Sequence, residues 1–547
     1  MADNSVTTDK PFGKWRSFFW PIYSYELKRL FPMFVLFFLI SFVYNLLRCM
    51  KIALMVTAAG SGAEAVPFLK IGAVLPGAIL LTYLFTKLSS KFSRETVFYT
   101  IIVGFLSYFA IFALILFPNR ESLELNSFYN YMLSMGVDSK GLKGLVAAVR
   151  HYNLTIFYVM CELWSSVVLS MLFWGFANEI TKVNEAKRFY AIFALGANCS
   201  GIFTGVFVTW LGSVTLPDVF NYTGGIKWVF YQLMAVLFLG LCIVGIFYWL
   251  NKSILHMSNM KTITIPKKKS DMSLKECFRY MFSSKYLSYI VILVVAYNVV
   301  YNLADVMWTD KVKSIYQSSE AVNAYMNRIT QITGFISAIF AFIISGNVIR
   351  RYGWTVAALV APIIWLLTSL GFFSGLLFES TIPEFLASID ASEIFYTMFA
   401  NPANLVLLLG SIQICLGRGC KYTVFDETKE IAFIPLSQEN QRKAKAVVDG
   451  IASRFGKSGG SVIYIILFTF LGSVSETVPY VSAIIFIAIG LWVFAVIGLG
   501  RMVTKTIDKE EADKESHSSS HDNNISNEKN TSAPIIINAV PGGELPA

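Results

Sequence analysis

The sequence predicts an all-α membrane protein that crosses the bilayer many times. Of its 547 residues, 55% are hydrophobic and only 15% are charged, whereas ordinary soluble domains carry roughly 25% charged residues. Apolar stretches of the length that crosses a bilayer as a helix, about 20 residues, recur along the whole chain. The composition therefore excludes a water-soluble enzyme, a disordered protein and a nucleic-acid-binding protein.

Twelve apolar stretches qualify as transmembrane helices. They are 31–50, 71–86, 97–117, 153–176, 190–211, 227–250, 286–307, 329–348, 355–377, 403–425, 449–472 and 480–499. The tenth and eleventh carry basic residues. A polar segment precedes the first stretch and no small-residue cleavage site follows it, so we interpret it as a retained helix and not as a signal peptide.

Basic residues set the predicted orientation. Most of the 45 Lys and Arg residues fall on one side of the membrane when the N-terminus is placed in the cytoplasm, because cytoplasmic loops are enriched in Lys and Arg. Both termini are then cytoplasmic. The same bias explains the net charge of +10 without nucleic-acid binding.

The polar stretch 251–285 divides the spans into six and six. Short basic turns at 87–94 and 346–353 occupy corresponding places in the two halves. They indicate two pseudo-symmetric six-helix halves, as in major-facilitator transporters, although any short inner loop tends to be basic. The predicted parts are an N-terminal arm (1–30), two bundles (31–250 and 286–502), a basic linker (251–285) and a disordered tail (503–547).

Neither a cofactor nor a metal ion is predicted. The seven cysteines are odd in number and lie mostly in apolar stretches, and the four histidines are scattered, so no metal-ligand or disulfide pattern emerges. No nucleotide-hydrolysing domain remains outside the spans. The predicted function classes are a secondary transporter, a channel or a membrane-embedded enzyme.

Ionisable residues inside spans are costly and therefore functional candidates. Glu162 lies within the fourth stretch, Lys51 closes the first and Asp305 lies in the seventh. Structural alternatives are an ion pair between Glu162 and a neighbouring lysine, and extension of Lys51 to the interface.

Four cations lie in the tenth and eleventh spans. They are Arg418, Lys421, Arg454 and Lys457. Each pair is spaced three residues apart and shares a helix face, so a phosphorylated ligand or nearby carboxylates must balance the charge. The segment 456–458 lacks the spacing of a P-loop, and its glycines favour close helix packing or a local unwinding.

Several strings resemble the nucleotide transporter family of plastids and obligate intracellular bacteria. They lie at 162–181, 185–190, 425–436 and 454–460, and the resemblance extends over 10–501. The family's important charged residues match Lys51, Glu162, Asp305 and Lys457. The resemblance implies transport of nucleotides across the bacterial inner membrane, either by ATP/ADP exchange or by import with protons.

Two departures favour import over exchange. Where exchangers read Arg-Asp-Thr-Lys-Asp at the end of the first span, this chain has Cys49 and Ile52 in place of the acids, and Thr309 replaces the Lys that follows the tryptophan of span seven. The sequence therefore predicts proton-coupled import of ATP, GTP or another nucleoside triphosphate, with an ATP/ADP antiporter as the alternative.

Each charged candidate receives a predicted role in alternating access by a monomer. Lys51, Lys457, Arg418, Lys421 and Arg454 bind phosphates, and Glu162 and Asp305 balance these cations or carry protons. Either Tyr44 or Phe455 is suited to stack on the base. A membrane-embedded enzyme is not expected, since the longest outer loop, 118–152, lacks a recognisable reactive constellation.

Overall fold

The structure is a computed structural model of the 547-residue chain. It describes residues 22–136, 141–181, 183–219, 222, 226–252, 279, 284–343, 347–381, 384, 401–436 and 438–529. These residues are helical throughout apart from turns and one isolated β-bridge between Val219 and Tyr222. The prediction of an all-α protein is confirmed.

The helices follow one another with short connections. The α-helices are α2 (Ser24–Val56), α3 (Ala65–Leu69), α4 (Leu75–Lys91), α5 (Arg94–Ile111), α6 (Asn126–Ser134), α7 (Lys143–Arg150), α8 (Tyr152–Leu163), α9 (Trp174–Ile180), α10 (Val183–Ser213), α11 (Lys227–Leu250), α13 (Lys285–Ile315), α14 (Ser319–Ile343), α15 (Asn347–Leu377), α18 (Pro402–Cys420), α19 (Asp426–Ala432), α20 (Gln438–Lys445), α21 (Ser453–Leu471) and α22 (Val474–Lys529). A short 3₁₀-helix, η8, spans Glu379–Thr381.

Five π-helical segments widen these helices. They are η1 (Lys70–Val74), η2 (Phe112–Leu116), η4 (Trp164–Phe173), η9 (Lys421–Phe425) and η10 (Ala446–Ala452). Segment η1 joins α3 to α4 and η4 joins α8 to α9, so each makes one continuous helix with its neighbours. Wide π turns of this kind occur frequently at functional sites.

Ten helices in the described part of the chain are long and apolar enough to cross a membrane. They coincide with ten of the twelve predicted spans. The other two predictions correspond to α14 and α21, which are helices but carry many polar residues. Asn323, Asn327 and Thr330 lie in α14, and Arg454 and Lys457 lie in α21. Buried polar side chains, not lipid-facing ones, explain the low hydropathy of α14.

Two predicted boundaries differ from the structure. Helix α2 begins at Ser24 and not at residue 31, because the Glu26 carboxylate accepts a hydrogen bond of 2.9 Å from the Tyr23 N–H and caps the helix. Helix α22 continues to Lys529, whereas the sequence predicted disorder from residue 503. Residues 505–515 are rich in Lys, Glu and Ala, which are strong helix formers. Most of the predicted linker, 253–278, and residues 530–547 lie outside the described residues.

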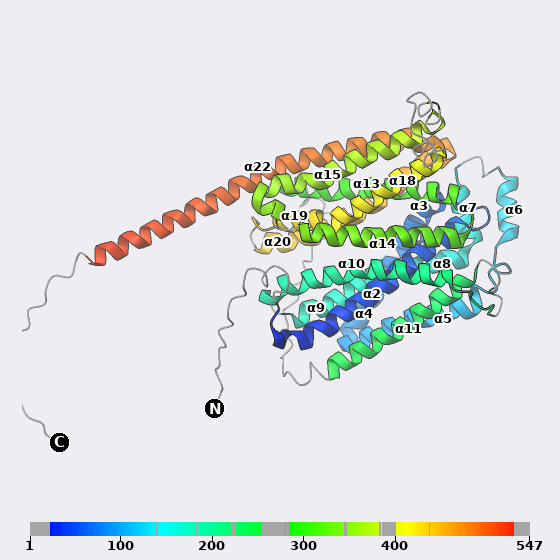
Figure 1. The fold of residues 1–547 in the computed structure, drawn as a ribbon, viewed down its shortest axis with the longest axis horizontal. Helices are drawn as coiled ribbons and strands as arrows, with labels where there is room; N and C mark the ends of the chain where they lie inside the picture. Colours follow the sequence, from blue (N-terminus) through cyan, green and yellow to red (C-terminus); the bar gives the residue numbers. More distant parts are fainter. Residues whose placement is uncertain are drawn as a thin grey trace, which may run out of the picture.

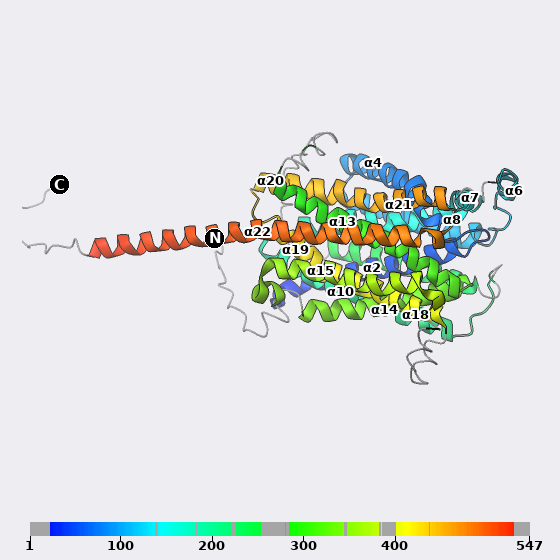
Figure 2. The same cartoon turned by 90° about the horizontal axis from the view of Figure 1, so that it is seen from above.

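The helices of the first part of the chain pack together, as do those of the second part. In Figure 1, α2, α4, α5 and α8–α11 lie below, and α13, α15, α18 and α22 lie above. Helices α10 and α14 run side by side between them, and α2 also packs against α14. In both views α22 extends far beyond the bundle (Figures 1 and 2).

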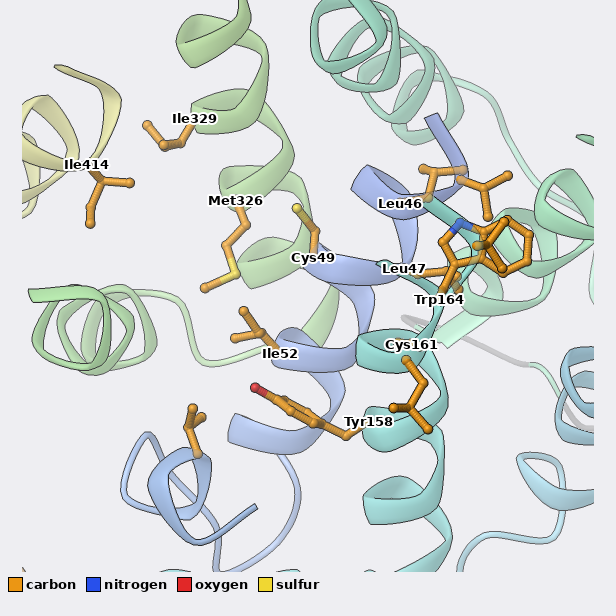
Figure 3. Close-up of a cluster of buried hydrophobic side chains, with 14 of the residues drawn as sticks. Leu46, Leu47, Cys49, Ile52, Tyr158, Cys161, Trp164, Met326, Ile329 and Ile414 are labelled. Atoms are coloured by element: carbon orange, nitrogen blue, oxygen red, sulfur yellow. The ribbon is translucent and has the colours of Figure 1, made fainter. Parts of the chain in front are cut away.

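Helices α2 and α13 are central to the molecule. Both bury side chains around most of their circumference. Figure 3 shows Cys49 and Ile52 of α2 between Tyr158 of α8 and Met326 of α14. These apolar neighbours give charges in the same helix a low-dielectric surrounding, which strengthens electrostatic interactions.

Candidate functional site

Lys51 and Glu162 form an ion pair between α2 and α8. The Lys51 side chain is 4% exposed, and its ammonium also lies 4.4 Å from the centre of the Tyr158 ring. A buried lysine in this position does not extend to the membrane interface, so that structural alternative is excluded. Glu162 remains 35% exposed. The pair is therefore accessible on the side of the carboxylate.

Asp305 lies at the centre of a second charged group, formed around α13. Nη2 of Arg418 donates to Oδ1 of Asp305 at 3.0 Å, and Nε of Arg418 donates to the Tyr301 hydroxyl at 3.0 Å. Nη2 of Arg48 donates to the same hydroxyl at 3.2 Å. Two arginines from α2 and α18 thus converge on one face of α13.

Asn302, the neighbour of Tyr301, connects two further lysines. Nζ of Lys70 lies 3.5 Å from the Asn302 side-chain oxygen. The Asn302 amide nitrogen donates to the backbone carbonyl of Lys457 at 2.7 Å. Lys70 also interacts electrostatically with Asp305, Lys457, Arg48 and Arg418. The charged residues of α2, η1, α13, α18 and α21 therefore occupy one region.

Lys421 and Arg454, the other two predicted phosphate ligands, have different surroundings. Nζ of Lys421 pairs with Asp426 at 2.9 Å, which is the structural alternative foreseen for it. Arg454 is exposed, and the described residues provide it with no ion-pair partner. No described contact joins either residue to Asp305.

The sequence prediction missed four residues of this region: Arg48, Lys70, Tyr301 and Asn302. Lys70 immediately precedes the apolar stretch predicted to begin at residue 71, and its helix begins earlier, at Ala65. Tyr301 and Asp305 are four residues apart, so they share a helix face. That spacing was the available signal for Tyr301.

Positive charge exceeds negative charge in the region. Arg48, Lys51, Lys70, Arg418 and Lys457 are cations, and Glu162 and Asp305 are the acids that contact them. An excess of buried cations is unfavourable unless an anion balances it. Phosphate groups are suitable partners, because arginine and lysine bind them through charge-assisted hydrogen bonds.

The family assignment rests on the whole sequence. A family model described as TLC ATP/ADP transporter matches residues 5–502. The chain belongs to this family. It is 38% identical over 506 residues to ADP,ATP carrier protein 1 of Chlamydia muridarum, covering 91% of this chain and 92% of that one. It is 35% identical over 505 residues to ADP,ATP carrier protein 1 of Rickettsia bellii, covering 91% and 98%.

Solved structures agree with this fold. A bacterial homologue of the iron transporter ferroportin in an inward-facing state has a TM-score of 0.53 at 15% identity, covering 87% of this chain and 99% of that one. A D-xylose-proton symporter has a TM-score of 0.50 at 11% identity, covering 86% and 98%. The TLC-family chain is therefore a multi-pass nucleotide transporter with a major-facilitator-like fold, and not an enzyme. The predicted resemblance is confirmed.

The glycines next to Lys457 hold α21 against α13 in this TLC-family protein. A Cβ atom at Gly456 would lie 2.7 Å from the Asn298 Cβ and 3.0 Å from the Val295 carbonyl oxygen. A Cβ atom at Gly460 would lie 2.9 Å from the Asn302 Cβ. Gly459 faces open space. Close packing, one of the two predicted roles, therefore holds for the first two glycines.

We expect Gly456→Ala to destabilise the protein by about 1–3 kcal/mol, the usual effect of overpacking. The new methyl group would push against the α13 backbone, which cannot move as a side-chain end can. The apparent unfolding temperature of the purified protein measures the effect. Gly459→Ala is the matched control and should be neutral or slightly stabilising, because alanine favours the helix. Equal stability of both variants would contradict the close-packing role.

Proposed function

We propose that this TLC-family protein exchanges ATP for ADP across the bacterial cytoplasmic membrane, so that ATP enters the cell. The observation that carries the proposal is the excess of cations around Asp305 and Glu162. Four of the five cations have side chains that are buried or joined by direct contacts to α13 or α8. A nucleotide brings the negative charge that this region lacks.

Arg48, Lys51, Arg418 and Lys457 bind the phosphate groups in this proposal. Glu162 and Asp305 hold Lys51 and Arg418 in place when no nucleotide is bound, since a buried cation needs a partner. Lys421 and Arg454 would act before binding, by attracting the polyanion toward the site. Charged residues along an entry path raise the local concentration of an oppositely charged ligand.

Electrical work favours exchange over net import. Moving about four negative charges of ATP against 100 mV costs roughly 9 kcal/mol at 2.3 kcal/mol per charge. Exchange for ADP leaves a net movement of about one charge, or roughly 2.3 kcal/mol. Both acids of the site already have cationic partners, so charge balance does not require a proton. The relatives in Chlamydia and Rickettsia are named ADP,ATP carriers.

Proton-coupled net import is the second candidate. The specific observation in its favour is that Cys49 and Ile52 occupy positions where exchangers of the resembling family carry acids. Fewer acids make the site more positive and leave Glu162 and Asp305 as the groups suited to carry protons. The substrates would then be ATP, GTP or another nucleoside triphosphate.

Alternating access by a monomer fits the distribution of contacts. Near α3 and α7, the two parts of the chain meet: the Lys313 ammonium donates to the Ser61 carbonyl oxygen, and Gly141 packs directly against the Phe468 backbone. At the opposite end, Arg29 pairs with Glu185 within the first part. We propose two six-helix halves that rock around the site, with both termini cytoplasmic.

Transport into vesicles containing the purified protein tests the proposal. Labelled ATP should accumulate in vesicles preloaded with ADP and enter empty vesicles at a much lower rate. An uncoupler should leave the exchange rate unchanged. Rapid uptake into empty vesicles that an uncoupler abolishes would favour proton-coupled import instead, and recovery of hydrolysed nucleotide would contradict transport without chemistry.

A further inference from the structure

Lys70 lies inside a membrane span and not in a loop. The continuous helix Ala65–Lys91 is long and apolar enough to cross the membrane, and Lys70 is the first residue of its π-helical segment η1. The Lys70 side chain is half-buried. An ammonium group at this depth is costly and marks a functional residue.

Lys70 lacks a carboxylate partner among the residues that the structure describes. Its one direct contact is the 3.5 Å approach of Nζ to the Asn302 side-chain oxygen. An amide oxygen accepts a hydrogen bond but does not neutralise a charge. Lys51 and Arg418, by contrast, each contact a carboxylate directly. Lys70 therefore has room for an anionic ligand.

Two pairs of cations flank neighbouring residues of α13. Arg48 and Arg418 both donate to the Tyr301 hydroxyl. Lys70 and Lys457 both contact Asn302, the first through its side chain and the second through its own backbone carbonyl. Consecutive residues of a helix point about 100° apart, so the two pairs lie beside each other around α13.

We infer that Lys70 and Lys457 form a second phosphate-binding subsite next to the subsite of Arg48 and Arg418. The inference deepens the proposed function and rests on it. A nucleotide with two or three phosphates reaches both pairs at once, whereas a monophosphate reaches one. Lys70 is thereby a specificity-determining residue that favours ATP and ADP over AMP.

The test compares Lys70→Gln with Lys91→Gln, which removes a lysine from the exposed end of the same helix. In ADP-loaded vesicles, Lys70→Gln should weaken competition by unlabelled ATP and by ADP about tenfold or more, since a charge-assisted phosphate contact is lost. Competition by AMP should change little. Lys70→Arg should retain most of the affinity, and Lys91→Gln should behave as the wild type.

A second variant keeps Lys70 and removes its availability. Asn302→Asp places a carboxylate at the 3.5 Å contact, so it should also weaken ATP and ADP more than AMP. This variant decides the question if Lys70→Gln fails to insert in the membrane. Wild-type affinity for ATP in both variants, or an equal loss for ATP, ADP and AMP, would overturn the inference. Absence of nucleotide exchange by the wild-type protein would instead contradict the proposed function.

Discussion

Lys51→Gln is expected to reduce ATP uptake by about 10- to 100-fold, as befits the loss of a charged hydrogen bond worth about 1.5–3 kcal/mol. Lys51 is almost completely buried between Glu162 and the Tyr158 ring. Its ammonium group is therefore held in place before a nucleotide arrives. Initial rates of labelled ATP uptake into ADP-loaded vesicles measure the effect, normalised to the amount of protein inserted.

A double-mutant cycle separates phosphate binding from simple ion pairing. Lys51→Gln leaves the Glu162 carboxylate without its cation, and Glu162→Gln leaves Lys51 without its acid. The double variant removes both charges. If the pair serves stability alone, the double variant should recover uptake, because neither charge remains unpaired. If Lys51 binds phosphate, uptake should stay low in the double variant, and that is the result we expect.

Asp305→Asn is expected to cause the largest loss of stability in the site. Arg418 is buried and donates to the Asp305 carboxylate at 3.0 Å. Removing one partner of a buried ion pair typically costs about 3–5 kcal/mol, because the other charge remains unbalanced. The apparent unfolding temperature should fall markedly, and uptake should fall with it. Adding ATP should restore part of the lost stability, since its phosphates replace the missing negative charge.

Asp310→Asn provides the matched control for this experiment. Asp310 lies in the same helix, and no cation approaches it within ion-pair distance in the described part of the chain. This variant should keep nearly the wild-type unfolding temperature. An equal decrease in both variants would show that α13 tolerates no change of charge anywhere, and would remove the special role of the Asp305–Arg418 pair.

The sequence revealed residues by their cost but not by their neighbours. Lys51, Glu162 and Asp305 stood out because ionisable residues rarely occur within apolar stretches. Their partners could not be predicted, since a sequence does not specify which helix faces meet. Arg418 joins Asp305, whereas Lys421, three residues later, pairs with Asp426. The segment η9 begins at Lys421 and changes the helical spacing there.

Hydropathy predicted the helices well where they face lipid and less well where they face one another. Helix α14 packs against α10, α2 and α18, so its polar residues are covered by protein and not by lipid. The same effect hid Lys70. Its position before an apolar stretch suggested a loop, but α3 begins five residues earlier and carries Lys70 into the span.

The π-helical segments make the length of the chain as important as its chemistry near the site. Segment η1 begins at Lys70, and η10 ends just before Arg454 and Lys457. Each wide turn acts as a tolerated one-residue insertion in an α-helix. Deleting a single residue from η10 would rotate all of α21 by about 100° relative to the preceding helix. Gly456 and Gly460 would leave α13, and Lys457 would face another direction although every side chain of the site was still present.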